Sequence, residues 1–341
     1  MLDRQPVASF AEIRQILRDL PGPDLEAATR TATREALLTK PTGALARLEE
    51  ITQWLATWQG KHPPAVNHPR VAVFAGNHGV ADLGVSAYPK EVTAQMVLNF
   101  QSGGAAVNQL CKNADADLRV YEMCLDQPTA DFTQGPALTE EETARAMAYG
   151  MMAVEPGVDL LCVGEMGIAN TTSAAAMAAA LFGGTGQEWA GPGTGIHGSA
   201  LSRKAEVIDL GLARHRDRFE DGLAILQCLG GHELAAIAGA VIAARMARVP
   251  VLLDGFASTV AAATLLKLDS HALDHCLVAH CSAEPGHRKV LAKMNKQPLL
   301  DLGMRLGEGS GAALAIPLIR AAAMCHSGMA SFAEAGVSNK D

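Results

Sequence analysis

Hydrophobic and polar positions follow two different periodicities along this chain. Residues 8–19 and 25–39 carry apolar side chains at helical spacing, with Pro21 and Pro23 between them. From residue 70 the pattern changes, because residues 70–76 form an almost continuous apolar run that ends in glycine. Such a run is typical of a strand that is buried on both faces of a parallel sheet. Similar runs predict further strands at 118–121, 158–163, 249–253 and 276–279.

The segments between these strands are rich in alanine and are predicted to be helices, among them 173–182 and 234–247. This alternation predicts an α/β fold with a doubly wound, mainly parallel sheet of Rossmann-like type. The apolar segment 311–327 predicts a last helix that packs with the N-terminal helices. We therefore expect an α/β core domain over 66–295, with the phosphate- and base-binding turns, and a smaller helical lobe built from 1–65 plus 296–341.

Composition and charge narrow the class of ligand. Hydrophobic residues make up 49% and charged residues 19% of 341 residues, which is typical of a packed globular protein. The formal net charge of −8 repels a phosphate backbone, and the aromatic share of 4% offers few stacking platforms for bases. Nucleic acid is therefore not an expected partner.

The N-terminal residues lack the pattern of a signal peptide, and the longest apolar stretch, 234–244, is too short to span a bilayer. The seven cysteines include no C-x-x-C pair, so neither a disulfide framework nor a four-thiolate zinc site is indicated. These features favour a cytoplasmic protein that does not associate with a membrane.

Residues 164–172, Gly-Glu-Met-Gly-Ile-Ala-Asn-Thr-Thr, connect an expected strand to an expected helix. Glycine followed by Asn170, Thr171 and Thr172 at a helix start offers backbone N–H groups and hydroxyls, which is how proteins hold a phosphate. The same three residues would also serve as an ordinary helix cap. The turn alone leaves both interpretations open.

Two more glycine-rich turns carry candidate chemistry. Residues 191–195, Gly-Pro-Gly-Thr-Gly, allow a ligand close to the backbone, although a surface loop has the same composition and the spacing is not that of a dinucleotide site. Residues 306–312 place Glu308 between two glycines, where its carboxylate can reach a ligand. The dipole of the following helix would lower the pKa of Glu308 and oppose a role as a base, and only an apolar pocket would raise that pKa again.

Several common motifs are missing from the sequence. It contains no P-loop, no H-E-x-x-H pair and no G-x-S-x-G elbow. A diphosphate held with magnesium would require neighbouring acidic residues at a strand end, and the strand before residue 164 offers only Asp159. We therefore expect a monophosphate ligand and no metal.

Six motifs occur in an order and spacing that resemble one enzyme family, the nicotinate-nucleotide:dimethylbenzimidazole phosphoribosyltransferases. The motifs are 74–80 (Phe-Ala-Gly-Asn-His-Gly-Val), 84–96, 164–172, 251–255 (Val-Leu-Leu-Asp-Gly), 282–284 (Ser-Ala-Glu) and 305–312. The resemblance extends from residues 40–49 to about residue 323, nearly the whole chain.

The resemblance implies transfer of phosphoribose from nicotinate mononucleotide to 5,6-dimethylbenzimidazole or a related base, which gives α-ribazole 5′-phosphate and nicotinate in cobalamin nucleotide-loop assembly. It implies that Glu308 is the general base, with Glu165 as a second acidic residue. It also implies that the protein forms a homodimer, that its binding partners are these small-molecule substrates, and that it needs no cofactor. The implied phosphoribose-binding residues are Gly167, Asn170, Thr171, Thr172, Lys204, Ser282, Glu284 and Gly307, and the implied base-binding residues are Tyr88, Met96 and Leu306.

Two alternatives remain at this point. A transferase of the same fold acting on another azole, a purine or a phenol would differ only in the base pocket. A non-catalytic nucleotide-binding protein would have no need of a carboxylate at the base. A Rossmann-type oxidoreductase is the least favoured, because the dinucleotide motif is missing.

Overall fold

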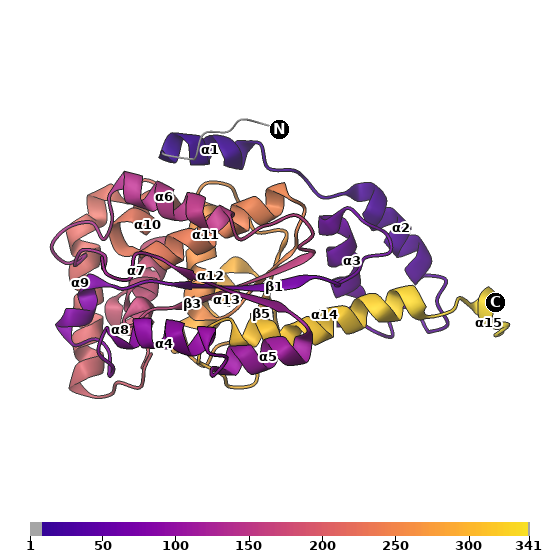
Figure 1. The fold of residues 1–341 in the computed structure, drawn as a ribbon. Coiled ribbons are helices and arrows are strands. Elements are labelled where there is room, and N and C mark those ends of the chain that lie inside the picture. The colour runs from indigo at the N-terminus through magenta and orange to yellow at the C-terminus, as the bar shows by residue number, and fades with distance from the viewer. Residues whose placement is uncertain (1–8, 340–341) are drawn as a thin grey trace.

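Six parallel strands form the centre of the protein (Figure 1). The computed structural model describes residues 9–339. The sheet order is β2-β1-β3-β4-β5-β6, so the chain reverses its winding direction between β1 and β3. In doubly wound sheets ligands bind at such a switch point, beyond the carboxyl ends of the strands. The strands are β1 (Pro69–Ala75), β2 (Asp117–Glu122), β3 (Leu160–Met166), β4 (Val251–Leu253), β5 (Cys276–His280) and β6 (Pro298–Leu300).

Both faces of the sheet are covered by helices. Successive residues of a strand point to opposite faces, and β1 illustrates this: Val71 and Val73 join one hydrophobic cluster, whereas Ala72 and Phe74 join the other. The first cluster includes residues of α3 (Arg47–Gln59), α4 (Val92–Gln101), α5 (Ala106–Ala114) and α14 (Ser310–Gly328). The second includes residues of α1 (Phe10–Arg18), α6 (Glu140–Met151), α7 (Asn170–Phe182), α10 (Gly222–Leu229), α11 (His232–Met246), α12 (Phe256–Ala263) and α13 (Pro285–Met294). The predicted doubly wound α/β class is confirmed.

Four more helices and three 3₁₀ turns complete the elements of residues 9–339. They are α2 (Leu25–Glu35), α8 (Gly186–Trp189), α9 (Ser199–His215), α15 (Phe332–Ala335) and the 3₁₀ turns η1 (Gly79–Leu83), η2 (Arg216–Arg218) and η3 (Thr264–Lys267).

Several helices begin or end a few residues away from the positions that the sequence predicts. The helix predicted over 25–39 ends at Glu35, and the helix predicted from 173 begins at Asn170. The helix predicted over 8–19 is seen as Phe10–Arg18, and its first predicted residue, Ala8, lies outside the described residues. Strand β6 was not predicted, because it has three residues and begins with Pro298, which an edge strand tolerates.

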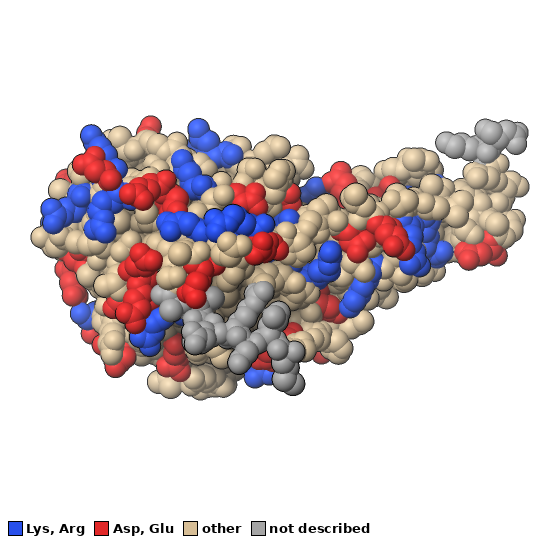
Figure 2. All heavy atoms as spheres, turned by 90° about the horizontal axis from the view of Figure 1, so that it is seen from above, with Lys and Arg blue, Asp and Glu red and all other residues tan. Residues whose placement is uncertain are grey.

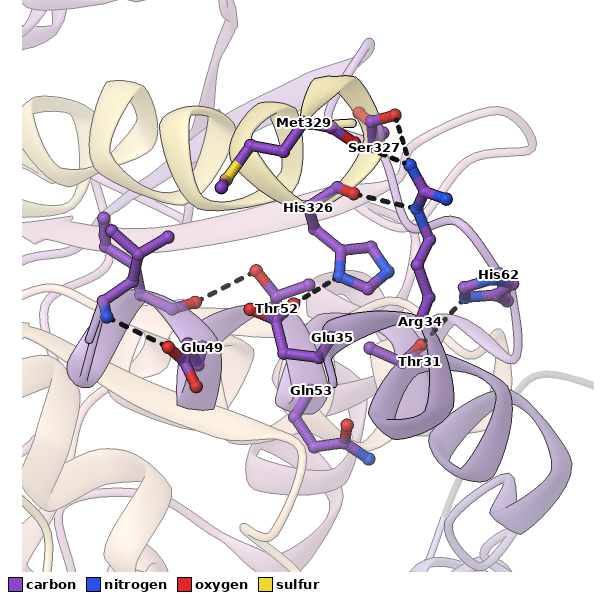
Figure 3. Close-up of polar contacts among 12 residues, drawn as sticks. Thr31, Arg34, Glu35, Glu49, Thr52, Gln53, His62, His326, Ser327 and Met329 are labelled. Atoms are coloured by element: carbon purple, nitrogen blue, oxygen red, sulfur yellow. Dashed lines mark hydrogen bonds and ion pairs between the residues drawn. The ribbon is translucent and has the colours of Figure 1, made fainter. Parts of the chain in front are cut away.

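Helices α2, α3, the end of α14 and α15 extend away from the sheet on one side (Figure 1). Polar contacts link these helices there (Figure 3). Arg34 Nε donates a hydrogen bond to the carbonyl oxygen of His326 at 3.1 Å, and His326 Nδ1 pairs with Glu35. His62 Nδ1 lies 3.1 Å from Thr31 Oγ1. The boundaries of the small lobe proposed from the sequence stay a prediction.

The face seen from above carries acidic and basic side chains interspersed with each other (Figure 2). Among residues 9–339, no helix is both long and apolar enough to cross a membrane.

Candidate active site

A cavity of about 520 Å³ opens at the carboxyl ends of the strands. Its floor is formed by Glu165 and Met166 at the end of β3, Gly255 after β4 and His280 at the end of β5. The turn 167–171 and the loop 305–308 before α14 also line the cavity. The cavity therefore lies where a doubly wound sheet binds its ligand.

Glu308 enters this cavity from a strained turn. Gly307, Glu308 and Gly309 all have left-handed φ angles, 80°, 64° and 75°. Glycine adopts this conformation freely, whereas for Glu308 it costs about 1 kcal/mol or more. Such strain persists only where the surrounding structure fixes it, and the N–H of Glu308 donates to the carbonyl oxygen of Glu165 at 3.1 Å.

Close packing also fixes this turn. A methyl group added to Gly164 would lie 2.2 Å from the backbone nitrogen of Gly309, so the turn touches the backbone of β3. The Glu308 residue is only 6% exposed, and within residues 9–339 its carboxyl group has no hydrogen-bond partner. The group is therefore free to receive a ligand.

Asp254, directly after β4, caps the N-terminus of α14, the helix that follows Glu308. Its carboxyl oxygens accept hydrogen bonds from the N–H groups of Gly309 at 3.1 Å and Ala312 at 2.8 Å. Burial raises the pKa of Glu308 to about 7, and the nearby Asp254 adds to the increase. Burial also raises the pKa of Asp254 to about 7, against the opposing effect of these backbone hydrogen bonds. The helix dipole is thus directed at Asp254, and burial decides the pKa of Glu308.

Glu165 is a second acidic group on the cavity floor. Asn170 Nδ2 donates a hydrogen bond to Glu165 Oε2, which ties the end of β3 to the first residue of α7. Burial raises the pKa of the Glu165 carboxyl well above its usual range. The Asn170 hydrogen bond opposes this increase, and the carboxyls of Asp254 and Glu308 add to it.

The turn between β3 and α7 lines the same cavity as Glu308. Ala169 has a left-handed φ of 74°, and its N–H has no acceptor among the described residues. Lys204 of α9 lies behind this wall, fully buried, and its Nζ donates to Thr171 Oγ1 at 2.8 Å and to the carbonyl oxygen of Gly191 at 2.9 Å. Burial lowers the pKa of Lys204 to about 8, and the charge of Glu284 opposes this. The wall combines a helix N-terminus with a nearby ammonium group, an arrangement suited to an anion.

The loop 191–195 closes the cavity from the side. Glu284 Oε1 accepts a hydrogen bond from the N–H of Gly193 at 2.8 Å, and Arg305 Nη1 donates to the Gly193 carbonyl oxygen at 2.7 Å. Thr194 Oγ1 accepts from the N–H of Ala87 at 2.9 Å. Of the residues that line the cavity, Arg305 is the only lysine or arginine.

An apolar surface lies between these polar walls. It comprises Val85, Tyr88, Val92, Met96, Phe256 and Leu306. Tyr88 and Leu306 are 56% and 54% exposed, so they lie at the mouth of the cavity.

Most of the site residues named from the sequence line this one cavity. They are Glu308, Glu165, Gly167, Asn170, Thr171, Ser282, Glu284, Gly307, Tyr88, Met96 and Leu306. Two do not line it: Lys204 contacts Thr171 from behind, and Thr172 is fully buried with a hydroxyl that has no partner within residues 9–339. The roles of these residues are taken up as proposals below.

The sequence predicts no role for Asp254, Arg305, Phe256 or His280, although Asp254 and Arg305 belong to two of its motifs. A usable signal existed for Asp254, because a carboxylate directly after a buried strand lies at the ligand-binding edge of such a sheet. Within residues 9–339, no group of three or more His, Cys, Asp or Glu side chains is placed to hold a metal ion.

A family model, protein relatives and a solved structure that resemble this chain all carry the name of a phosphoribosyltransferase. A family model described as phosphoribosyltransferase matches residues 20–337. A Brucella canis protein named nicotinate-nucleotide–dimethylbenzimidazole phosphoribosyltransferase is 56% identical over 329 residues, covering 96% of this chain and 97% of its own length. A Rhizobium meliloti protein of the same name is 56% identical over 332 residues, covering 97% and 98%. The crystal structure of the Thermus thermophilus protein of that name superposes with a TM-score of 0.86 at 41% identity, covering 93% of this chain and all of that one.

The fold and the family model together define a phosphoribosyltransferase. More narrowly, the chain belongs to the nicotinate-nucleotide–dimethylbenzimidazole phosphoribosyltransferase family, as its six motifs predicted.

Proposed function

We propose that this protein transfers phosphoribose from nicotinate mononucleotide to 5,6-dimethylbenzimidazole or a related base, with release of nicotinate and formation of α-ribazole 5′-phosphate for cobalamin nucleotide-loop assembly. The names of its relatives and its family membership support this. The observation that carries the proposal is Glu308, which among the described residues is an unpartnered carboxyl group with a pKa raised to about 7 by burial, in the same cavity as a turn suited to phosphate.

The phosphoribose unit binds along the polar walls in this proposal. Its phosphate lies at the N-terminus of α7, near Gly167, Asn170 and Thr171, with the ammonium group of Lys204 behind. Ser282, Glu284 and Gly307 line the adjoining surface and contact the sugar. Thr172 supports the turn from inside the protein, because its side chain is fully buried.

The chemistry needs one base and good positioning. One nitrogen of the benzimidazole attacks C1′ of the ribose, and the bond between C1′ and the pyridinium nitrogen breaks with its electron pair on nicotinate. The configuration at C1′ inverts. The proton on the other benzimidazole nitrogen passes to Glu308, while nicotinate leaves without a positive charge on its ring nitrogen and needs no acid. Glu165, close to Glu308, is a second acidic group beside the same ring, and no cofactor or metal takes part in this scheme.

The base occupies the apolar slot between Tyr88, Met96 and Leu306. Methionine adapts its shape to different ring substituents, so the slot suits a flat bicyclic base. A transferase acting on another azole, a purine or a phenol would use the same walls, and competition between bases in one reaction distinguishes these substrates.

The decisive experiment incubates the protein with nicotinate mononucleotide and 5,6-dimethylbenzimidazole in the presence of a chelator. Chromatography should detect free nicotinate and α-ribazole 5′-phosphate in equal amounts. The Glu308→Gln variant should bind nicotinate mononucleotide and give almost no product. Binding by the wild-type protein without any nicotinate release would favour the non-catalytic nucleotide-binding alternative.

We also propose that the protein acts as a homodimer in the cytoplasm, with a smaller helical lobe from 1–65 plus 296–341 packed on the α/β core. The exposed apolar side chains of Leu25, Leu37 and Met324 on that lobe support a partner surface there. Sedimentation equilibrium of the purified protein tests the dimer.

A further inference from the structure

His78 belongs to the motif 74–80, to which the proposed reaction assigns no role. It follows β1 and is fully buried. Its Nδ1 lies 3.0 Å from Ser173 Oγ, and its Nε2 lies 2.6 Å from Glu233 Oε1. Ser173 and Glu233 are fully buried as well. One imidazole thus joins the segment after β1, the first turn of α7 and the first turn of α11.

The hydrogen-bond order serine, histidine, carboxylate is also that of hydrolytic triads. A nucleophile must reach its substrate, and the Ser173 side chain is enclosed by protein. Ser173 and Glu233 do not line the cavity either. Ser173 is therefore not a nucleophile, and the three side chains have a structural role.

The network lies directly behind the phosphate turn. A methyl group added to Gly167 would lie 2.6 Å from the carbonyl oxygen of Gly76 and 3.5 Å from Glu233 Oε1. A methyl group on Gly76 would lie 2.5 Å from Glu233 Oε2. The inner side of Gly167 is thus within contact distance of the Glu233 carboxyl, while its outer side lines the cavity.

This placement creates an electrostatic problem that His78 answers. Among residues 9–339, Glu233 Oε2 has no hydrogen-bond partner, and His78 is the one side chain that pairs with Glu233, through Oε1. A buried carboxylate is unfavourable unless it is paired, and its negative charge would also repel a phosphate on the other side of the turn. The N–H of His78 offsets part of that negative charge.

We propose that His78 is a positioning residue for the phosphate turn: together with Ser173 and Glu233 it fixes the first turn of α7 and offsets the carboxylate behind Gly167, and so sets the affinity for phosphate-bearing ligands without touching them. This inference rests on the proposed phosphate site, but its test does not depend on turnover.

The test measures binding of ribose 5-phosphate by calorimetry to the full-length protein and to three variants. Ser173→Ala removes one hydroxyl from an alanine-rich helix, where alanine is the best helix former. Ser258→Ala is the matched control, because Ser258 is also buried in a helix but its hydroxyl has no partner in the described part of the chain. His78→Gln removes the ring that joins both partners.

We expect Ser173→Ala to weaken ribose 5-phosphate binding about three- to tenfold, the effect of losing one buried hydrogen bond. His78→Gln should weaken it at least as much, and Ser258→Ala should leave it unchanged. In turnover, the KM for nicotinate mononucleotide should rise by the same factor, with kcat and the KM for the base unchanged. With nicotinate riboside, which lacks the phosphate, Ser173→Ala and wild type should react alike.

Equal phosphate affinity of Ser173→Ala and Ser258→Ala would overturn the inference. So would a loss that falls on kcat, on the KM for the base, or equally on nicotinate riboside, since a general loosening of the fold produces those results. A wild-type protein that binds ribose 5-phosphate but releases no nicotinate would refute the proposed function and leave this inference standing.

Discussion

Replacing Glu308 with glutamine should abolish base catalysis and, at alkaline pH, stabilise the protein. Glutamine keeps the size and the left-handed backbone position of Glu308 but cannot accept a proton. We expect kcat to fall by about 10²- to 10⁴-fold, the usual contribution of a general base. The KM for nicotinate mononucleotide should change little, because the proposed phosphate turn, residues 167–171, is a different segment of the cavity lining.

The pH dependence follows from the pKa of Glu308. Burial raises that pKa from 4.5 to about 7, and only the ionised carboxylate can take a proton. The kcat/KM of the wild-type enzyme should therefore rise with pH, with a midpoint near 7, and the residual activity of Glu308→Gln should not follow this curve. In the complex, the positive charge of the pyridinium ring favours ionised Glu308, so the midpoint for kcat should lie below the midpoint for kcat/KM.

The same shift predicts an effect on stability. A carboxyl group whose pKa is raised on folding stabilises the folded state below its unfolded pKa, and this contribution is lost as the pH rises through the folded pKa. A shift from 4.5 to about 7 corresponds to roughly 3 kcal/mol. Urea unfolding at about pH 5 and about pH 9 should show wild type losing up to this amount relative to Glu308→Gln.

Two results would refute this reasoning. One is a Glu308→Gln variant with wild-type kcat. The other is a wild-type enzyme that is fully active at about pH 5, where the raised pKa of Glu308 keeps the group protonated.

Three further substitutions test the other walls. Lys204→Met should raise the KM for nicotinate mononucleotide by about tenfold and abolish the loss of affinity that we expect in wild type as the pH rises through about 8, measured by initial rates. Gly164→Ala would place a methyl group 2.2 Å from the backbone nitrogen of Gly309, so kcat should fall and thermal unfolding should occur several degrees lower, as calorimetry would record. Arg305→Met should reduce kcat/KM more for nicotinate mononucleotide than for its nicotinamide analogue, because Arg305 is the only lysine or arginine lining the cavity; equal losses would contradict a carboxylate contact.

The sequence predicted the strands that carry the site and most of the residues around the cavity. Long apolar runs such as 70–76 predict buried strands, because a strand that is covered on both faces has no polar side. Glycine-bearing turns after these strands also pointed to the correct edge of the sheet. Strand β6 escaped, since its pairing with β5 is set by tertiary contacts and not by its three residues.

The ionisation of Glu308 could not be read from the sequence for a related reason. The local sequence shows only that a helix follows Glu308, and the dipole of that helix would lower the pKa of Glu308. Asp254, which is distant in the chain, accepts the first hydrogen bonds of that helix instead. Burial and the charge of Asp254 then act on Glu308 in the opposite direction, and both depend on which strands are neighbours in the sheet.

The order of strands therefore connects fold and chemistry in this protein. Strands β3, β4 and β5 are consecutive in the sheet, and their ends supply Glu165, Asp254 and His280 to one small volume. Burial there raises the pKa values of Glu165 and Glu308, and the neighbouring carboxyl groups add to the increase because like charges disfavour ionisation. A positively charged pyridinium ring reverses that balance when it binds beside them. In the proposed reaction the substrate itself thus helps to ionise the base that its departure requires, so that Glu308 is most ready to accept a proton when nicotinate mononucleotide is in place.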